Sequence, residues 1–176
     1  IPHAPKKQAI SFVMEKGSVM DLPTDKALTR MTIRIGGAMS RQASTDLDMD
    51  IAAVLYRKDG TSLGTVSHEN LSEWGLTHGG DAMKDGNPAL VDDSESLSAD
   101  LLHIPDSVEQ IFFIVTVYTL GGTFADLADA WCRVVDQNAN ELAKYVLTGG
   151  HEISGMVIAR LFRSPSSAAG KRWGFQ

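Results

Sequence analysis

The sequence has little of three features that define common protein classes. It contains one cysteine, Cys132, so it cannot form an internal disulfide. No run approaches the roughly 20 apolar residues of a bilayer-spanning helix, and the N-terminal stretch has no apolar segment long enough for a signal peptide. Excess positive charge is also missing, because the net charge is −6. These absences argue against a membrane-spanning protein and against nucleic acid as a partner, and they predict a cytoplasmic location.

The apolar content is sufficient for one core. Of 176 residues, 43% are hydrophobic and 22% are charged, which is typical of a folded domain and not of a disordered chain. We expect residues 1–9 to form an N-terminal tail and residues 10–176 to form a single domain.

Apolar residues alternate with polar ones far more often than they follow helical spacing. In 31–35 the alternation places Met31 and the two following isoleucines on one buried face, and 96–101 has the same pattern. The runs 51–56 and 111–118 are apolar on both faces, which is typical of central strands covered on both sides.

Turn-forming residues separate these runs at 58–60, 136–140 and 149–150, so we expect hairpins. Residues 124–130 have apolar residues at i, i+3 and i+4, which predicts one helical turn. The predicted fold class is mainly β: a two-sheet antiparallel β-sandwich with one or two short helical turns.

Carboxylates gather in two short stretches, 46–50 and 81–95, each beside an apolar run. A hard cation such as Ca²⁺ takes about 6–8 oxygen ligands. Short acidic loops on a rigid scaffold can supply these oxygens, so the two stretches favour Ca²⁺ binding. Asp48 and Asp50 leave one face of a strand about 7 Å apart, which is too wide for one strand to chelate alone. The second stretch therefore has to supply further ligands. An EF-hand is excluded, because Ile51 and Arg57 stand where its loop needs Gly and a bidentate Glu.

A solvated acidic surface is the alternative interpretation of these residues. Two carboxylates about 5 Å apart repel by roughly 3 kcal/mol at an effective dielectric constant of 20. Only Lys84 lies inside the second stretch, and one ammonium group cannot neutralise its five acids. A divalent cation would neutralise them better if folding brings the two stretches together.

Several short motifs occur in a fixed order along the chain. They include Met14-Glu15-Lys16-Gly17, Asp48-Met49-Asp50, His78-Gly79-Gly80-Asp81, Asp92-Asp93-Ser94-Glu95, His103-Ile104-Pro105, Trp131-Cys132-Arg133-Val134-Val135 and Arg160-Leu161-Phe162-Arg163. Their order and spacing resemble the TerD family of tellurium-resistance and stress proteins, over nearly the whole chain.

The resemblance implies a β-sandwich that binds Ca²⁺ through the Asp-x-Asp strand and the acidic loop, with a role in resistance to tellurite and other chemical stress and with no enzymatic activity. The loop departs from the family pattern at Ala82-Met83-Lys84. The metal ligands that the resemblance implies in this sequence are Asp48, Asp50, Asp81, Asp93 and Glu95, with Asp92 as a close alternate.

Three non-catalytic functions stay open. The first is a Ca²⁺-dependent module whose ordered loop binds a protein partner in a stress-response complex. The second is a metal-free interaction or scaffold domain. The third is docking to a membrane surface, which is less supported because only Trp74 and Lys84 flank the acidic loops.

No catalytic motif is complete. His151-Glu152 begins like a zincin motif but lacks the second histidine. We expect Cys132 to be a buried, inert thiol. His78 lies beside the acidic loop, where it could orient a ligand carboxylate.

Overall fold

The computed structural model describes residues 12–13, 17–22, 28–39, 47–80, 95–147, 152–164 and 173–176. These residues form two stacked β-sheets of seven and six strands, with one short 3-10 helix. The predicted β-sandwich is therefore confirmed.

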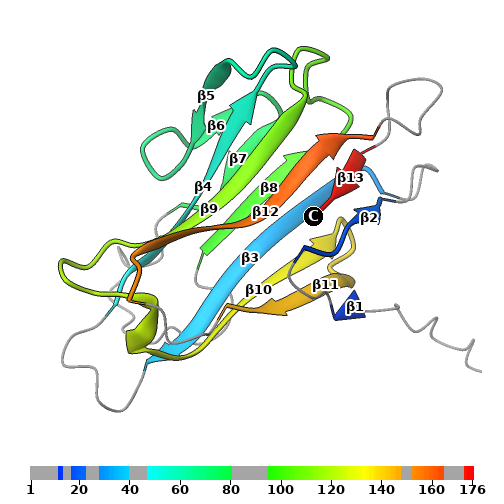
Figure 1. The fold of residues 1–176 in the computed structure, drawn as a ribbon. Coiled ribbons are helices and arrows are strands. Elements are labelled where there is room, and N and C mark those ends of the chain that lie inside the picture. The colour runs from blue at the N-terminus through cyan, green and yellow to red at the C-terminus, as the bar shows by residue number, and fades with distance from the viewer. Residues whose placement is uncertain are drawn as a thin grey trace, which may run out of the picture.

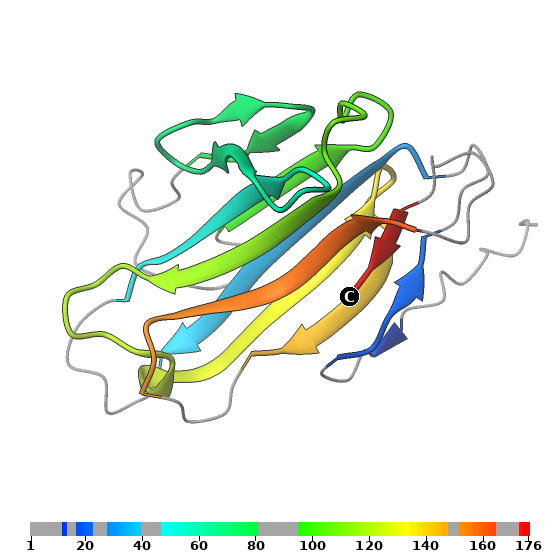
Figure 2. The same cartoon turned by 45° about the horizontal axis from the view of Figure 1, so that its top comes forward.

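Each sheet draws its strands from both halves of the chain. In spatial order the seven-stranded sheet contains β1 (Phe12–Val13), β11 (Glu141–Val146), β10 (Leu127–Asp136), β3 (Arg30–Met39), β8 (Glu95–Asp100), β7 (Leu76–His78) and β6 (Ser72–Glu73). The six-stranded sheet contains β2 (Met20–Asp21), β13 (Trp173–Phe175), β12 (Gly155–Arg163), β9 (Gln110–Val117), β4 (Met49–Tyr56) and β5 (Ser62–Val66). Figures 1 and 2 show β12, β9 and β4 lying over the layer that contains β3 and β10. Pairing is antiparallel except for β1, which is parallel to β11.

Inward-facing side chains of the two sheets form the core. On β3, Met31, Ile33 and Ile35 are fully buried, as the alternation predicts. The opposite sheet supplies bulky partners, because inward side chains of β4 and β9 are equally buried. Among the largest fully buried residues are Phe113, Phe124, Phe175, Met49, Ile51, Leu55, Leu76, Leu97 and Ile111.

Strands β4 and β9 pair along their whole length inside the six-stranded sheet, which confirms the predicted central position for β9 and for the second half of β4; the first half of β4 has no β5 neighbour. Phe113 and Val115 point inward and are buried, whereas Phe112 and Ile114 on the outer side are half-buried. The apolar runs predict covering on both sides, but the described residues cover the outer face only in part.

Short turns join the strands where the sequence predicts them. In the turn between β4 and β5, Asp59 accepts hydrogen bonds from the Thr61 N–H (2.9 Å) and hydroxyl (2.7 Å). Asp136 likewise accepts from the Asn138 and Asn140 N–H groups, both at 2.8 Å, between β10 and β11. The predicted turn at 149–150 lies outside the described residues.

The predicted helical turn is a 3-10 helix, η2 (Phe124–Asp126), and the chain then continues directly as β10. The Asp126 carboxylate accepts a hydrogen bond from the Thr123 N–H (2.9 Å), which closes this turn. In the part of the chain that the structure describes, no helix is long and apolar enough to cross a membrane.

One corner of the sandwich has an irregular edge. Strand β5 pairs with β4 only from Ala53 onward, so the first half of β4 has no β5 neighbour. Strand β7, which pairs with β8 in the other sheet, brings His78 to this uncovered edge. We call this place, where β4 begins and β8 begins, the β4–β8 corner.

Candidate metal site at the β4–β8 corner

The predicted metal ligands come from three separate segments. Asp48 immediately precedes β4, Asp50 lies within it, and Glu95 begins β8. Because β4 and β8 belong to different sheets, these residues approach the corner from both layers. The remaining acids of the predicted site lie outside the described residues: Asp81, Asp92 and Asp93.

The loop after β9 holds the start of β4 in place. The Asp48 N–H donates to Thr119 Oγ1 (2.9 Å), and its carbonyl accepts from the Tyr118 N–H (2.8 Å). Asp50 lies on the outer side of β4 but is only 8% exposed, and its Oδ1 is 3.6 Å from His68 Nδ1. A carboxylate this buried is stabilised by a positive neighbour, either a protonated imidazole or a metal ion.

His78 and Glu95 meet in the interior of the sandwich. His78 Nε2 lies 3.2 Å from Glu95 Oε2 and 3.0 Å from the Ile51 carbonyl oxygen. Its Nδ1 accepts a hydrogen bond from the Gly80 N–H (3.0 Å), so a neutral ring carries its hydrogen on Nε2. That hydrogen is donated to the Ile51 carbonyl, and Glu95 Oε2 lies close to the same nitrogen. His78 thus links β4 of one sheet to β8 of the other.

Two glycines let the chain turn beside His78. A Cβ at Gly79 would lie 2.4 Å from Ser96 Oγ, and Gly80 has a φ of +93°, which favours glycine. The Gly79 N–H donates to the Ser96 carbonyl (2.8 Å), so the two chain segments lie side by side here. The acidic stretch between Gly80 and Glu95 is therefore attached at both ends to the β4–β8 corner.

The described residues bring part of the predicted ligand set to one corner. Within the described ranges, no group of three or more His, Cys, Asp or Glu side chains could hold a metal ion. Asp50 leaves the outer side of β4, whereas Glu95 faces inward with Leu97 and Ala99. The chemistry of these donors fits Ca²⁺, which takes carboxylate and carbonyl oxygens and not imidazole nitrogen. The predicted site thus needs oxygens from the acidic stretch in addition to Asp48, Asp50 and Glu95.

Comparison with known proteins identifies the family. The TerD domain matches residues 10–176. The chain belongs to the TerD family. It is 32% identical over 120 residues to tellurium resistance protein TerZ of Serratia marcescens, a match that covers 67% of this chain and 60% of TerZ. It is 24% identical over 161 residues to general stress protein 16U of Bacillus subtilis, covering 85% of this chain and 82% of that protein.

A solved structure shares the TerD fold. It is a homologue of the telluride resistance protein TerD from Streptomyces coelicolor, with a TM-score of 0.62 at 18% identity. The match covers 85% of this chain and 87% of that chain. The resemblance that the motifs indicate is therefore confirmed at the level of family and fold.

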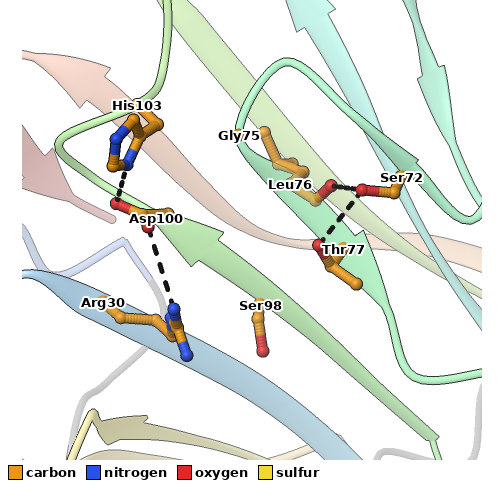
Figure 3. A pocket seen from close by; sticks show the side chains of 8 residues that line it. All are labelled: Arg30, Ser72, Gly75, Leu76, Thr77, Ser98, Asp100 and His103. Carbon is orange, nitrogen blue, oxygen red and sulfur yellow. Dashed lines mark hydrogen bonds and ion pairs between the residues drawn. The ribbon is translucent and has the colours of Figure 1, made fainter.

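A polar pocket of about 340 Å³ is a second feature of this TerD protein, and the sequence does not predict it. It lies on the outer face of the seven-stranded sheet, at the far end of β8. Figure 3 shows Asp100 between Arg30 (3.8 Å) and His103 (3.1 Å). On the other side of the pocket, the Ser72 hydroxyl lies 3.3 Å from Thr77 Oγ1. The i, i+3 spacing of Asp100 and His103 is a sequence signal that could have indicated this pair.

The neighbours of Asp100 keep its carboxyl charged. Burial acts to raise the pKa of Asp100, but hydrogen bonds from His103 and the Leu102 N–H, with the charges of His103 and Arg30, outweigh burial and lower it. The pocket of this TerD chain therefore holds an ionised acid beside Arg30 and His103.

Cys132 is fully buried on β10, as predicted. Burial raises the pKa of its thiol far above the usual range, so the thiol stays neutral. Since the thiolate is the reactive form, this residue does not supply thiol chemistry to the TerD domain.

Proposed function

We propose that this TerD protein is a Ca²⁺-binding module of the stress response. Ca²⁺ orders the acidic stretch after Gly80, and the ordered stretch forms a surface for a protein partner. The names of two relatives, a tellurium resistance protein and a general stress protein, support the stress context. In this proposal the module binds without catalysis and works in the cytoplasm. The proposed ligands are Asp48, Asp50, Asp81, Asp93 and Glu95, with Asp92 as an alternate.

The burial of two carboxylates near one corner carries this proposal. Asp50 is 8% exposed and Glu95 is 4% exposed. One imidazole nitrogen of His78 lies near both Glu95 and the carbonyl of Ile51, the residue after Asp50. Burying an ionised carboxylate costs several kcal/mol unless it is paired or binds a metal ion. A divalent cation at this corner would offset buried negative charge, and the acidic stretch attached there offers further oxygens.

A metal-free interaction domain is the second candidate. The observation that favours it is that each buried carboxylate already has an imidazole neighbour, His68 for Asp50 and His78 for Glu95. A protonated imidazole beside Asp50, together with the Nε2–H of the neutral His78 ring 3.2 Å from Glu95, would stabilise the acids without an ion. In that case the sandwich itself, and not a metal-ordered loop, provides the binding surface.

Calorimetric titration of Ca²⁺ into chelator-treated protein separates the two candidates. We expect micromolar or tighter binding, and loss of that binding in the double variant Asp50→Asn, Glu95→Gln. The matched control is Asp59→Asn, Asp100→Asn, which removes two carboxylates that lie away from the corner and should leave the titration unchanged.

Each other outcome is decisive. Absence of binding heat in the unmodified protein favours the metal-free domain. Full Ca²⁺ binding by the corner variant would show that the ion sits elsewhere on the chain. Binding that weakens equally in the corner variant and the control would assign the heat to general surface charge.

A further inference from the structure

The polar pocket lies over a row of hydroxyl groups on the outer face of the seven-stranded sheet, which we call the hydroxyl row. Direct register partners on four neighbouring strands form it: Thr32 on β3, Ser98 on β8, Thr77 on β7 and Ser72 on β6. The row pairs at each end, Thr32 with Ser98 at 2.8 Å and Ser72 with Thr77 at 3.3 Å. Within the described part of the chain, no hydrogen bond joins Ser98 to Thr77. The middle of the row therefore opens into the pocket, which both residues line.

Asp100 and Arg30 form the charged wall of the pocket, beside Ser98 (Figure 3). Asp100 Oδ1 lies 3.1 Å from His103 Nδ1 and accepts a hydrogen bond from the Leu102 N–H (3.2 Å). Asp100 Oδ2 has only Arg30 Nη2 nearby, at 3.8 Å, which is too long for a hydrogen bond. Among the described residues, the Arg30 guanidinium donates no hydrogen bond, although it carries several N–H groups. The wall thus presents an acceptor and a donor that are both available to a ligand.

The backbone holds this wall against the hairpin of β6 and β7. The Asp100 N–H donates to the Gly75 carbonyl (2.8 Å), and the Leu101 N–H donates to the Thr29 carbonyl (2.9 Å). A Cβ at Gly75 would lie 2.9 Å from the His103 carbonyl carbon, so glycine is needed for this close approach. The pocket is therefore fixed by backbone contacts on both sides and not only by the positions of its side chains.

We propose that the pocket binds a small, neutral, polyhydroxylated molecule, a sugar or a polyol. A hydroxyl group both donates and accepts a hydrogen bond. A hydroxyl oxygen about 2.8 Å from Arg30 Nη2 and from Asp100 Oδ2 bridges their 3.8 Å separation, because it accepts from the first and donates to the second. Further hydroxyls of the same molecule reach Ser98 and Thr77. The volume of about 340 Å³ lies near the lower end of the range of about 300–1,000 Å³ for small-molecule sites.

The charges and the lining select this class over others. Ionised Asp100 repels an anion, and Arg30 repels a cation. An ammonium group only donates and a carboxylate only accepts, so neither can bridge the two side chains as a hydroxyl does. The apolar lining residue is Leu76, which is fully buried, so the pocket offers little surface to an aromatic ligand. A ligand hydroxyl also reproduces the hydrogen bonds of the water that it displaces.

The test follows the amide signals of isotope-labelled protein by NMR while D-glucose or glycerol is added in the presence of chelator. We expect changes confined to signals from the pocket, with a dissociation constant in the millimolar range. The variant Thr77→Val, Asp100→Asn keeps the shape of both side chains but removes a hydroxyl and the charged acceptor. It should bind about tenfold more weakly, since hydrogen bonds to charged groups are the stronger ones. The matched control, Asp59→Asn, Thr61→Val, removes the same two groups from the β4–β5 turn and should bind like the unmodified protein.

The spectrum of each variant also shows whether it is folded. If the double variant is unfolded, Arg30→Gln gives the answer alone, because the Arg30 side chain is 57% exposed, and it should also weaken binding. Binding of only one of the two probes supports the proposal and distinguishes a sugar from a polyol. An unchanged spectrum with both probes, changes spread over the whole chain, or equal weakening in the control overturns it.

Sodium sulfate and glycine test the choice of a neutral ligand. A stronger response of the pocket signals to either of these than to glucose and glycerol would overturn that choice. The inference goes beyond the proposed function, because none of the proposed metal ligands lines this pocket. Chelator is present throughout, so the result does not depend on Ca²⁺ binding at the β4–β8 corner.

Discussion

Strand β8 carries one carboxylate at each end, and each carboxylate meets a histidine. Glu95 begins the strand and faces inward, where its side chain is 4% exposed and that of His78 is 0% exposed. Asp100 ends the strand and faces outward, where its side chain is 29% exposed and that of His103 is 77% exposed. The two nitrogen–oxygen distances are nearly equal, 3.2 Å and 3.1 Å.

Although the two distances are nearly equal, the two histidine–carboxylate contacts should contribute differently to the free energy of unfolding. An exposed ion pair contributes about 0–1 kcal/mol because water screens it. A buried polar group has no water to replace a lost partner, so removing the partner typically costs about 1–3 kcal/mol, and more where the group is charged. We therefore expect stability to depend more on the contacts of Glu95 at the inner end of β8 than on those of Asp100 in the polar pocket.

Replacing His78 with Ala should be the most damaging change in this comparison. The variant loses the contact to the Ile51 carbonyl and the imidazole next to Glu95, and it leaves a space in a fully buried site. We expect the free energy of unfolding to fall by about 2–4 kcal/mol, measured by urea denaturation in chelator. The control His103→Ala should change it by less than about 0.5 kcal/mol. Similar losses in both variants would show that burial does not distinguish the two ends of β8.

We expect Ca²⁺ to stabilise the folded protein through Glu95, at the inner end of β8, and not through Asp100. At a free Ca²⁺ concentration of 100 times the dissociation constant, binding stabilises the folded state by about 2.7 kcal/mol. Glu95→Gln keeps the side-chain shape but removes a proposed ligand charge, so this gain should largely disappear when urea denaturation is compared with and without chelator. Asp100→Asn should keep the whole gain. An undiminished gain in Glu95→Gln would remove Glu95 from the proposed ligand set.

The sequence predicts the interior strands of the two sheets better than their edge strands. Alternation identifies β3 and β8, and uniform apolar runs identify β4 and β9, because these strands bury side chains in the core. Strands β5, β6 and β7 have five residues or fewer and bury few side chains, so the sequence shows little alternation there. Their pairing depends on tertiary context. The parallel pairing of β1 with β11 is a similar case, since two residues carry no readable period.

The sequence predicts which residues belong to the candidate site but not how their side chains are arranged. Acid spacing and the TerD motifs indicate Asp48, Asp50 and Glu95, but they do not indicate the direction in which each carboxylate points. That direction follows from the sheet to which a strand belongs, which sets Asp50 on an outer side and Glu95 inside. The role of His78 is likewise a tertiary result, because its ring reaches across sheets to Ile51.

The smallest expected effect concerns the outer end of β8 and its pH dependence. The pKa of folded Asp100 is lowered from 3.8, so the folded state favours the ionised form. Its contribution to stability is therefore present above the unfolded pKa and is lost as the pH falls through the lowered folded pKa. We expect Asp100→Asn to reduce the free energy of unfolding by less than about 1 kcal/mol near neutral pH, because the pair is partly exposed. Urea denaturation at a series of pH values should show this difference shrinking toward zero below the ordinary pKa. A difference that grows on acidification would mean that the folded state prefers protonated Asp100, and the stabilising role of its charged neighbours would then be wrong.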